Sequence, residues 1–208
     1  MYSTTAALVM RADGSAIDGG AYLDVAGTAR HAPSWLDGLI SGYSTYGLAL
    51  FAVLMVTGWW QARRDRDAPQ ALKALAVPAL TVIAFAVSTV LKQAVHEMRP
   101  CRTLHVATLE ACPAPGDWSF PSNHATLAAA SAVALWFVSA RLGRIAAVGA
   151  LAMAASRVWV GAHYPHDIIA GLAVGAGVAF TLALLLHHYS DAAAGRLGRG
   201  RLRPLIVP

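Results

Sequence analysis

Charged residues are scarce in this sequence. Only 13% of its 208 residues are Asp, Glu, Lys or Arg, whereas 57% are hydrophobic. The mean hydropathy is +0.52. A soluble globular domain carries about 25% charged residues, so this composition excludes an ordinary soluble fold and indicates an integral membrane protein. The length is that of one domain.

Where charge is absent, the chain has apolar runs at residues 38–62, 74–91, 118–140, 145–156 and 168–190. A transmembrane helix needs about 20 residues, and the fourth run reaches that length only by continuing through Arg157 to Val160. We therefore predict an all-α, membrane-embedded helical bundle with about five transmembrane helices. The predicted units are an extracytoplasmic or interfacial segment (1–37), a transmembrane domain (38–190) and a basic cytoplasmic tail (191–208).

The basic residues gather on one side of this predicted bundle. Ten of the 16 Lys and Arg residues follow the first, third and fifth runs: Arg63, Arg64, Arg66, Lys73, Arg141, Arg144, Arg196, Arg199, Arg201 and Arg203. The positive-inside rule puts these segments in the cytoplasm and the other loops outside. The net charge of +5 is therefore a topology signal. We expect membrane lipids rather than nucleic acid as partners, and a multi-pass protein of the plasma membrane.

Two regions outside the apolar runs carry further predictions. Residues 1–12 lack a basic n-region, so no cleavable signal peptide is expected. Residues 21–39 fit either an interfacial helix anchored by Trp35 or an irregular polar leader.

Cys101 and Cys112 lie in a loop that the topology places outside. An oxidising compartment allows a disulfide there, and two free thiols are the alternative.

The first polar motif follows the second apolar run. Lys92 and Arg99 are two helical turns apart, so on a helix both would lie on one face, and Pro100 would end that helix. Snorkelling of two long cations at a helix end is the alternative.

The second motif, Pro121 to His124, contains favoured N-cap residues. A helix that begins here directs backbone N–H groups towards an anion, although a plain helix cap is the alternative.

The third motif joins the last two runs. His163 precedes Asp167 by four residues, which lets the carboxylate hold one imidazole nitrogen and leaves the other free to attack. His166 is the competing nucleophile, and a plain connecting loop is the structural alternative. With Arg157, the motifs supply three cations on one side of the membrane. Ionisable groups near lipid are retained for function, and three adjacent cations suit a multiply charged anion. We therefore predict a site that breaks a phosphate ester.

These motifs resemble the tripartite signature of the type 2 phosphatidic acid phosphatase (PAP2) superfamily over residues 92–167. They read Lys92 to Arg99-Pro100, Pro121-Ser122-Asn123-His124, and Ser156-Arg157 to His163 and Asp167. One departure is Asn123, where the family usually has Gly. Asn tolerates unusual backbone angles, so we expect catalysis to be retained, with a changed pocket width or an added contact to the phosphate.

The resemblance implies a metal-independent phosphatase without a cofactor. His163 would attack phosphorus to form a phosphohistidine, and Asp167 would orient it. His124 would protonate the leaving oxygen and then activate water. No metal cage is expected, because the acidic residues other than Asp167 are scattered along the sequence. The phosphate-binding residues would be Lys92, Arg99, Ser122, Asn123 and Arg157.

We expect a membrane lipid phosphatase that acts on the extracytoplasmic side. A polyprenyl diphosphate such as undecaprenyl diphosphate suits a small bacterial member of this family. Phosphatidic acid or phosphatidylglycerol phosphate is the alternative, and the motifs do not separate these substrates because each presents a terminal phosphate. Vanadium haloperoxidases share the signature but are soluble and larger. A non-catalytic lipid-binding or transport relative is disfavoured, because both His163 and His124 are present and internal repeats are not found.

Overall fold

The structure is a computed structural model that describes residues 13–200 and 203–206. Residues 1–12, which carry the signal-peptide prediction, lie outside the described residues. Every regular element in the described part of the chain is an α-helix, so the all-α prediction is confirmed. The helices are α1 (Ser15–Arg30), α2 (Ser34–Tyr46), α3 (Leu48–Arg64), α4 (Ala68–Val95), α5 (Pro100–Thr103), α6 (Asn123–Trp136), α7 (Ala140–Trp159), α8 (Pro165–Leu197) and α9 (Arg203–Ile206).

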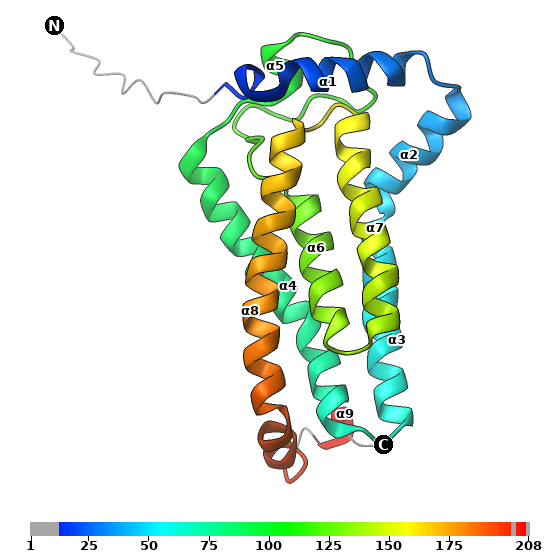
Figure 1. Ribbon diagram of the computed structural model, residues 1–208, viewed down its shortest axis with the longest axis vertical. Coiled ribbons are helices and arrows are strands. Elements are labelled where there is room, and N and C mark those ends of the chain that lie inside the picture. Colours follow the sequence, from blue (N-terminus) through cyan, green and yellow to red (C-terminus); the bar gives the residue numbers. More distant parts are fainter. Residues whose placement is uncertain (1–12, 201–202, 207–208) are drawn as a thin grey trace, which may run out of the picture.

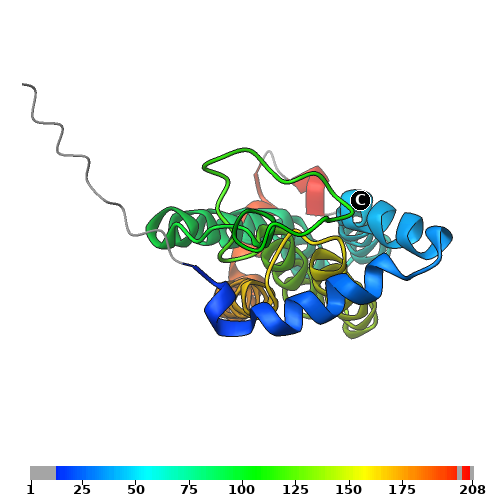
Figure 2. The same ribbon diagram turned by 90° about the horizontal axis from the view of Figure 1, so that it is seen from above.

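The long helices form a bundle that is covered at one end. Helices α3, α4, α6, α7 and α8 run along the long axis, and α1 crosses the end at which α7 stops and α8 starts (Figure 1). Seen from that end, α1 lies over both of these helices (Figure 2). Residues 21–39 are neither one helix nor an irregular leader, because they divide between α1 and α2, with a break at 31–33.

Small side chains allow the central helices to pack closely. Alanines dominate the core between α3, α4, α6 and α7, together with Phe51, Leu135 and Met153. Helix α8 approaches α6 so closely that a Cβ atom at Gly175 would lie 2.2 Å from the Thr126 carbonyl oxygen. Glycine permits this approach, and it brings the starts of α6 and α8 together at the covered end.

The number of membrane spans differs from the prediction. Three helical segments are long and apolar enough to cross a membrane: Ala68–Thr103, Ala140–Trp159 and Pro165–Leu197. Helices α2 and α3 pass the same test only as a pair that is bent by 53°. Helix α6 has 14 residues, which span about 21 Å of a hydrocarbon core of about 30 Å. The chain is therefore a multi-pass membrane protein, but the predicted count of five spans is not confirmed.

The shortness of α6 has a local cause. The third apolar run, 118–140, begins as a loop, in which the carbonyl oxygens of Trp118 and Ser119 bind the Lys92 ammonium group at 2.6 and 3.3 Å. Pro121 has no backbone N–H and disfavours a helical conformation at the residue before it, so α6 starts only after the Ser122 N-cap. At the other end of the chain, α8 continues past residue 190 to Leu197, and Ile206 of α9 packs against Ala62 and Ala71. Part of the predicted tail therefore packs onto the bundle.

Candidate active site

The three motifs meet at the end of the bundle that α1 covers. Each motif residue lies at a helix terminus or in a connecting loop: Lys92 in the last turn of α4, Arg99 before α5, Ser122 before α6, Arg157 in the last turn of α7, and His163 and Asp167 around the start of α8. Lys92, Arg99, Arg157, His163 and Asp167 are all buried. Buried charges are retained where they are paired or functional, so this cluster is the candidate site.

His163 and Asp167 form a buried pair. The Nδ1 atom of His163 lies 3.3 Å from Oδ2 of Asp167, and Nε2 lies 3.3 Å from Nη1 of Arg99. A guanidinium only donates hydrogen bonds, so Nε2 is the acceptor and the ring proton is on Nδ1. Burial, together with the Arg99 charge, lowers the pKa of His163 to about 3. The imidazole is therefore neutral, with the Nε2 lone pair available for attack.

The Asp167 carboxylate is itself held in place. Its Oδ2 atom accepts hydrogen bonds from the Tyr164 backbone N–H at 2.9 Å and from the Ser119 hydroxyl at 2.5 Å. The backbone N–H of Ser122 bonds to the Asp167 carbonyl at 3.1 Å. The second and third motifs are therefore joined by a direct main-chain contact.

The first motif is arranged differently from the prediction. Helix α4 ends at Val95, since His96 adopts a left-handed conformation with φ of 54°. Lys92 and Arg99 therefore do not share a helix face, and Pro100 begins α5 rather than ending α4. The extended segment between the helices lets Arg99 reach across the site to Asp117.

Arg99 links the loop before α6 to the loop before α8. Its guanidinium donates to the carboxylate and carbonyl of Asp117, both at 2.9 Å, and to the Ala162 carbonyl at 2.8 Å. Burial alone would raise the pKa of Asp117, but the hydrogen bond and charge of Arg99 hold it below its usual range. The Asp117 carboxylate is thus an anion held by the Arg99 guanidinium.

Arg157 is also paired with a carboxylate. Its Nη1 atom donates to Glu110 at 3.1 and 3.2 Å and to the Ser44 hydroxyl of α2. The Ser44 hydroxyl in turn donates to Glu110 at 2.7 Å. Two of the three motif cations therefore bind carboxylates of one loop, which the chain supplies between α5 and α6.

The second motif starts α6 and supplies the second histidine. Ser122 is the N-cap, with its hydroxyl accepting from the Ala125 N–H at 3.5 Å. The Asn123 side chain turns away towards α4, where its Oδ1 atom accepts from the Ser88 hydroxyl at 2.8 Å. Asn123, which stands where the family usually has Gly, thus links α6 to α4. His124, in the first turn of α6, is within electrostatic range of Arg157, Arg99 and Lys92.

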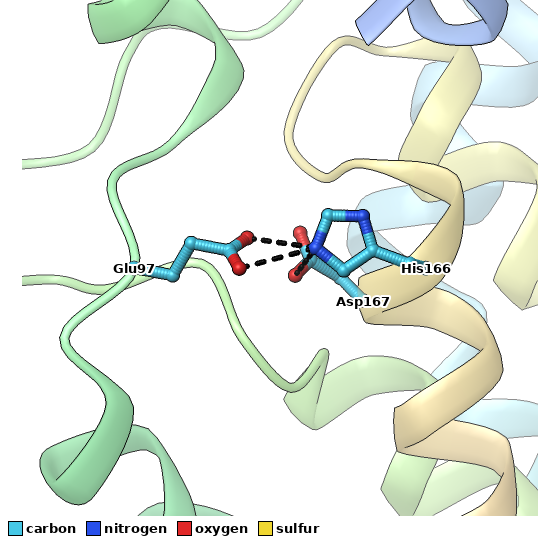
Figure 3. Close-up of side chains that lie close together, drawn as sticks. All are labelled: Glu97, His166 and Asp167. Carbon is cyan, nitrogen blue, oxygen red and sulfur yellow. Dashed lines mark hydrogen bonds and ion pairs between the residues drawn. The ribbon is translucent and has the colours of Figure 1, made fainter. Parts of the chain in front are cut away.

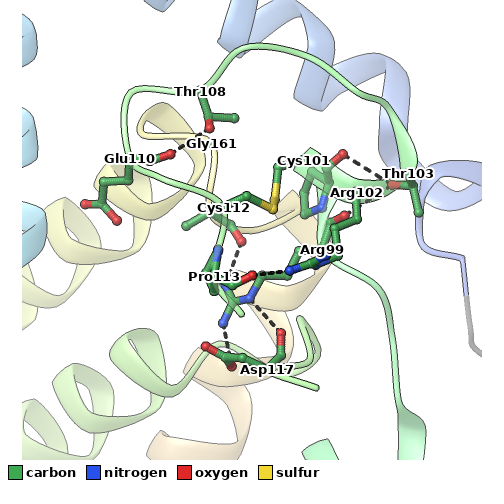
Figure 4. The surroundings of a disulfide bond; sticks show 12 residues. Arg99, Cys101, Arg102, Thr103, Thr108, Glu110, Cys112, Pro113, Asp117 and Gly161 are labelled. Atoms are coloured by element: carbon green, nitrogen blue, oxygen red, sulfur yellow. Dashed lines mark hydrogen bonds and ion pairs between the residues drawn. A yellow bond between two sulfur atoms is a disulfide. The ribbon is translucent and has the colours of Figure 1, made fainter. Parts of the chain in front are cut away.

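The loop that carries Glu110 and Asp117 is tied to α5 between these two residues, by a disulfide between Cys101 and Cys112 with a Cα–Cα distance of 6.0 Å (Figure 4). Arg102 braces the same loop by donating to the Pro113 carbonyl, whereas Arg99 reaches Asp117. Both arginines therefore contact this loop, and Arg99 also contacts His163.

Several acidic residues that are scattered along the sequence are brought to the site, and one of them joins a possible ligand cluster. Glu97 lies against His166 and Asp167, and ligand atoms of the three residues lie within 4.8 Å of one another (Figure 3). These are donor types that a divalent cation accepts, so scatter along the sequence does not keep Glu97 away from Asp167 in the fold. In the structure, His166 Nε2 bonds to both Glu97 oxygens at 3.1 Å, and Nδ1 bonds to Asp18 at 2.8 Å. Both nitrogens of His166 thus face carboxylates, whereas His163 has a carboxylate at Nδ1 and the Arg99 guanidinium at Nε2.

The site contains residues that the motifs did not predict. They are Asp18, Ser44, Glu97, Glu110, Asp117 and Ser119. One signal was available for Ser44, since the polar sequence Ser41-Gly-Tyr-Ser-Thr-Tyr46 interrupts the first apolar run. The two loop carboxylates also lie close in sequence to Cys112. Asp18 carries no comparable local signal.

Comparison with known proteins identifies the family. The PAP2 superfamily matches residues 70–192. Undecaprenyl-diphosphatase BcrC of Bacillus subtilis is 31% identical over 162 residues, which are 77% of this chain and 78% of that protein. A lipid A 1-phosphatase of Rhizobium johnstonii is 39% identical over 103 residues, but the match covers only 47% of this chain and 41% of the relative.

A solved structure supports the same fold. The first transmembrane PAP2 type phosphatidylglycerolphosphate phosphatase from Bacillus subtilis superposes with a TM-score of 0.51 at 20% identity, covering 88% of this chain and 89% of that one. The chain belongs to the PAP2 superfamily, as its three motifs predicted. It is an enzyme of the phosphatase class.

Proposed function

We propose that this protein removes the terminal phosphate of a polyprenyl diphosphate through a phosphohistidine on His163. The observation that carries the proposal is the buried His163–Asp167 pair, in which Nδ1 faces the carboxylate and Nε2 faces the cations. A neutral imidazole with a fixed tautomer is a competent nucleophile at neutral pH.

In the first step, the Nε2 lone pair of His163 attacks the terminal phosphorus, and the bond to the bridging oxygen breaks. His124 donates a proton to that oxygen, so the leaving group is the polyprenyl monophosphate. Asp167 stabilises the positive charge that develops on the imidazole. In the second step, His124 takes a proton from water, the water oxygen attacks phosphorus, and the P–N bond breaks to release inorganic phosphate.

The cations stabilise the negative charge of the transition state. Arg99 and Arg157 now bind the carboxylates of Asp117 and Glu110, and the phosphate oxygens take over these positions when substrate binds. Both carboxylates are partly exposed, with side-chain exposures of 50% and 27%. They can therefore turn towards solvent while the buried arginines stay in place. Lys92, Ser122 and the Asn123 backbone N–H complete the phosphate site.

The choice of substrate rests on a relative that aligns over most of the chain. BcrC is named as an undecaprenyl-diphosphatase and aligns over 77% of this chain. A second relative that is named an undecaprenyl-diphosphatase, from Sulfolobus acidocaldarius, is 34% identical over 48% of the chain. A diphosphate also suits the site, because its two phosphates carry more negative charge than a monoester.

The site is proposed to face the extracytoplasmic side. Figure 1 shows that the ends of α3 and α8 and the start of α7, which carry much of the basic charge, lie at the opposite end of the bundle from α1. The positive-inside rule assigns that basic end to the cytoplasm. The lipid phosphate then reacts at the outer surface.

The test is phosphate release by the purified protein in detergent, with undecaprenyl diphosphate, phosphatidic acid and phosphatidylglycerol phosphate compared at equal surface concentration. We expect the highest kcat/KM for the diphosphate. Quenching the reaction with substrate labelled at the terminal phosphate should trap an acid-labile, base-stable phosphoprotein that His163→Ala lacks. A higher kcat/KM for a glycerophospholipid would contradict the proposed polyprenyl diphosphate substrate. Absence of the phosphoprotein at a rapid-quench time point would contradict the proposed role of His163 as nucleophile.

A further inference from the structure

We propose that α1 is a positioning element of the active site, in which Tyr22 and Asp18 hold the two ends of the loop that carries His163. The inference rests on the proposed role of His163 as nucleophile and adds residues that lie outside the matched family region, 70–192. The loop joins Trp159 of α7 to Pro165 of α8, and α1 contacts Gly161 near its first end and His166 in the first turn of α8 at its second end.

Tyr22 holds the first end of the loop. Its hydroxyl donates to the Gly161 carbonyl at 3.1 Å, and its ring packs edge-on against Tyr164 with the centroids 5.6 Å apart. The Tyr22 side chain is fully buried. Burial raises its pKa to about 12, so the hydroxyl keeps its proton and remains a donor. A buried hydrogen bond of this kind fixes the Gly161 carbonyl relative to α1.

Asp18 holds the second end with both carboxylate oxygens. Oδ2 accepts from the backbone N–H of His166 at 2.7 Å, and Oδ1 bonds to the His166 ring nitrogen Nδ1 at 2.8 Å. That N–H belongs to the first turn of α8, whose N–H groups have no helical partner and favour a negative charge. Helix α1 is kinked at Asp18, with φ of −146°. Asp18 therefore caps α8 from a different helix.

Asp18 is connected to the Asp167 carboxylate by a continuous series of hydrogen bonds. His166 bonds to Glu97, and the Glu97 carbonyl accepts from the Ser119 N–H at 2.7 Å. The Ser119 hydroxyl then donates to Asp167 at 2.5 Å. The start of α1 also lies directly on this network, since a Cβ atom at Gly14 would be 2.7 Å from Glu97 Oε1. Displacing α1 would thus loosen the loop and the Asp167 support together.

The contribution of positioning residues is measurable, because a displacement of about 1 Å in a reacting group can lower a rate by up to 10²-fold. Asp18→Asn and Tyr22→Phe should each lower kcat about tenfold and change KM for the lipid diphosphate less than about twofold. Asp24→Asn is the matched control, because Asp24 is exposed on the same helix. Asp18→Glu, which restores a carboxylate, should recover part of the lost kcat.

A double variant tests whether Asp18 acts through His166. If it does, Asp18→Asn combined with His166→Asn should lower kcat no further than the more damaging single change. A second readout needs no substrate: amide hydrogen exchange of residues 161–167 should speed up in Asp18→Asn and stay unchanged in Asp24→Asn.

Unchanged exchange together with unchanged kcat in Asp18→Asn would overturn the proposal. So would an equal loss of kcat and thermal stability in both Asp18→Asn and Asp18→Glu, which would mark a purely structural contact. If the wild-type protein released no phosphate from any lipid, the proposed function would fail, while the exchange experiment would still decide whether α1 holds the loop.

Discussion

The two ends of the bundle use the same residue types in opposite ways. At the end covered by α1, Arg99 and Arg157 are buried and each binds a carboxylate. At the other end, Arg141, Arg144 and Arg196 are exposed. Removing a charge from water costs several kcal/mol unless it is paired, whereas an exposed arginine costs little and sets orientation. Lys73, at the other end, is also buried, but its partner is His187 rather than a carboxylate. Burial of arginines against carboxylates, rather than the number of basic residues, therefore distinguishes the end that we propose to be reactive.

The largest expected difference between the two ends is in turnover. His163→Ala should abolish phosphate release while leaving the fold intact, because it removes the nucleophile. His188→Ala, at an exposed position near the opposite end, should leave turnover unchanged. Phosphate release in detergent measures both variants. Activity of His163→Ala within about tenfold of wild type, a barrier change of about 1.4 kcal/mol, would contradict the assignment and make His166 the candidate.

Replacing Arg99 or Arg157 should lower kcat/KM by less than removing His163 does, but by more than the same change at Arg102. Arg99→Lys and Arg157→Lys keep the charge but lose the planar fork that matches phosphate oxygens. Loss of one charge-assisted hydrogen bond should cost about 1.5–3 kcal/mol, which lowers kcat/KM roughly 10- to 150-fold.

Arg102→Lys is the matched control for these two changes, since Arg102 contacts the disulfide loop through the Pro113 carbonyl and lies outside the motifs. We expect little change in its kcat/KM. An equal loss in Arg102→Lys and Arg99→Lys would mean that charge near the loop matters more than contact with phosphate.

Thiol labelling tests which end faces outward. A membrane-impermeant thiol reagent should label Cys101 and Cys112 in intact cells only after reduction, because the two sulfurs are joined. Labelling of intact cells without a reductant would agree with the proposed orientation but would show that the two cysteines are not joined. Labelling that requires a permeabilised membrane would reverse the proposed orientation of the two ends.

Chelation should have the smallest effect. EDTA should leave turnover unchanged, since Lys92, Arg99 and Arg157 supply the positive charge at the phosphate. Vanadate, which mimics five-coordinate phosphorus, should inhibit the same preparation and serves as the positive control. Activity lost with EDTA and restored by Mg²⁺ would assign that charge to a bound cation instead.

The sequence was most informative where chemistry is local. The four-residue spacing of His163 and Asp167 predicted their contact, and Ser122 marked the start of α6. The end of α4 was missed because a histidine, His96, takes the left-handed conformation that glycine usually takes there. The length of α6 was missed because the loop before it is as apolar as the helix.

Contacts between distant segments were beyond sequence reasoning. Ser44 and Arg157 are 113 residues apart, and Asp18 and His166 are 148 apart. Neither pair lies in a local pattern, and only the packing of α2 against α7 and of α1 against α8 brings them together. The motif residues could be found from spacing, whereas the residues that hold them in place could not.

The shortness of α6 determines how deep water must reach. Helix α6 spans about 21 Å, less than a hydrocarbon core of about 30 Å, so its first turn, with His124, lies deeper among the longer helices than it would in a full span. In the proposed mechanism the second step consumes a water molecule, which would have to reach this first turn. The polar residues Ser119 and Asp117 of the preceding loop lie beside the Asp167 and Arg99 side chains. A lipid diphosphate in the proposed orientation would then meet His163 by sinking its head group slightly, without pulling its tail out of the membrane.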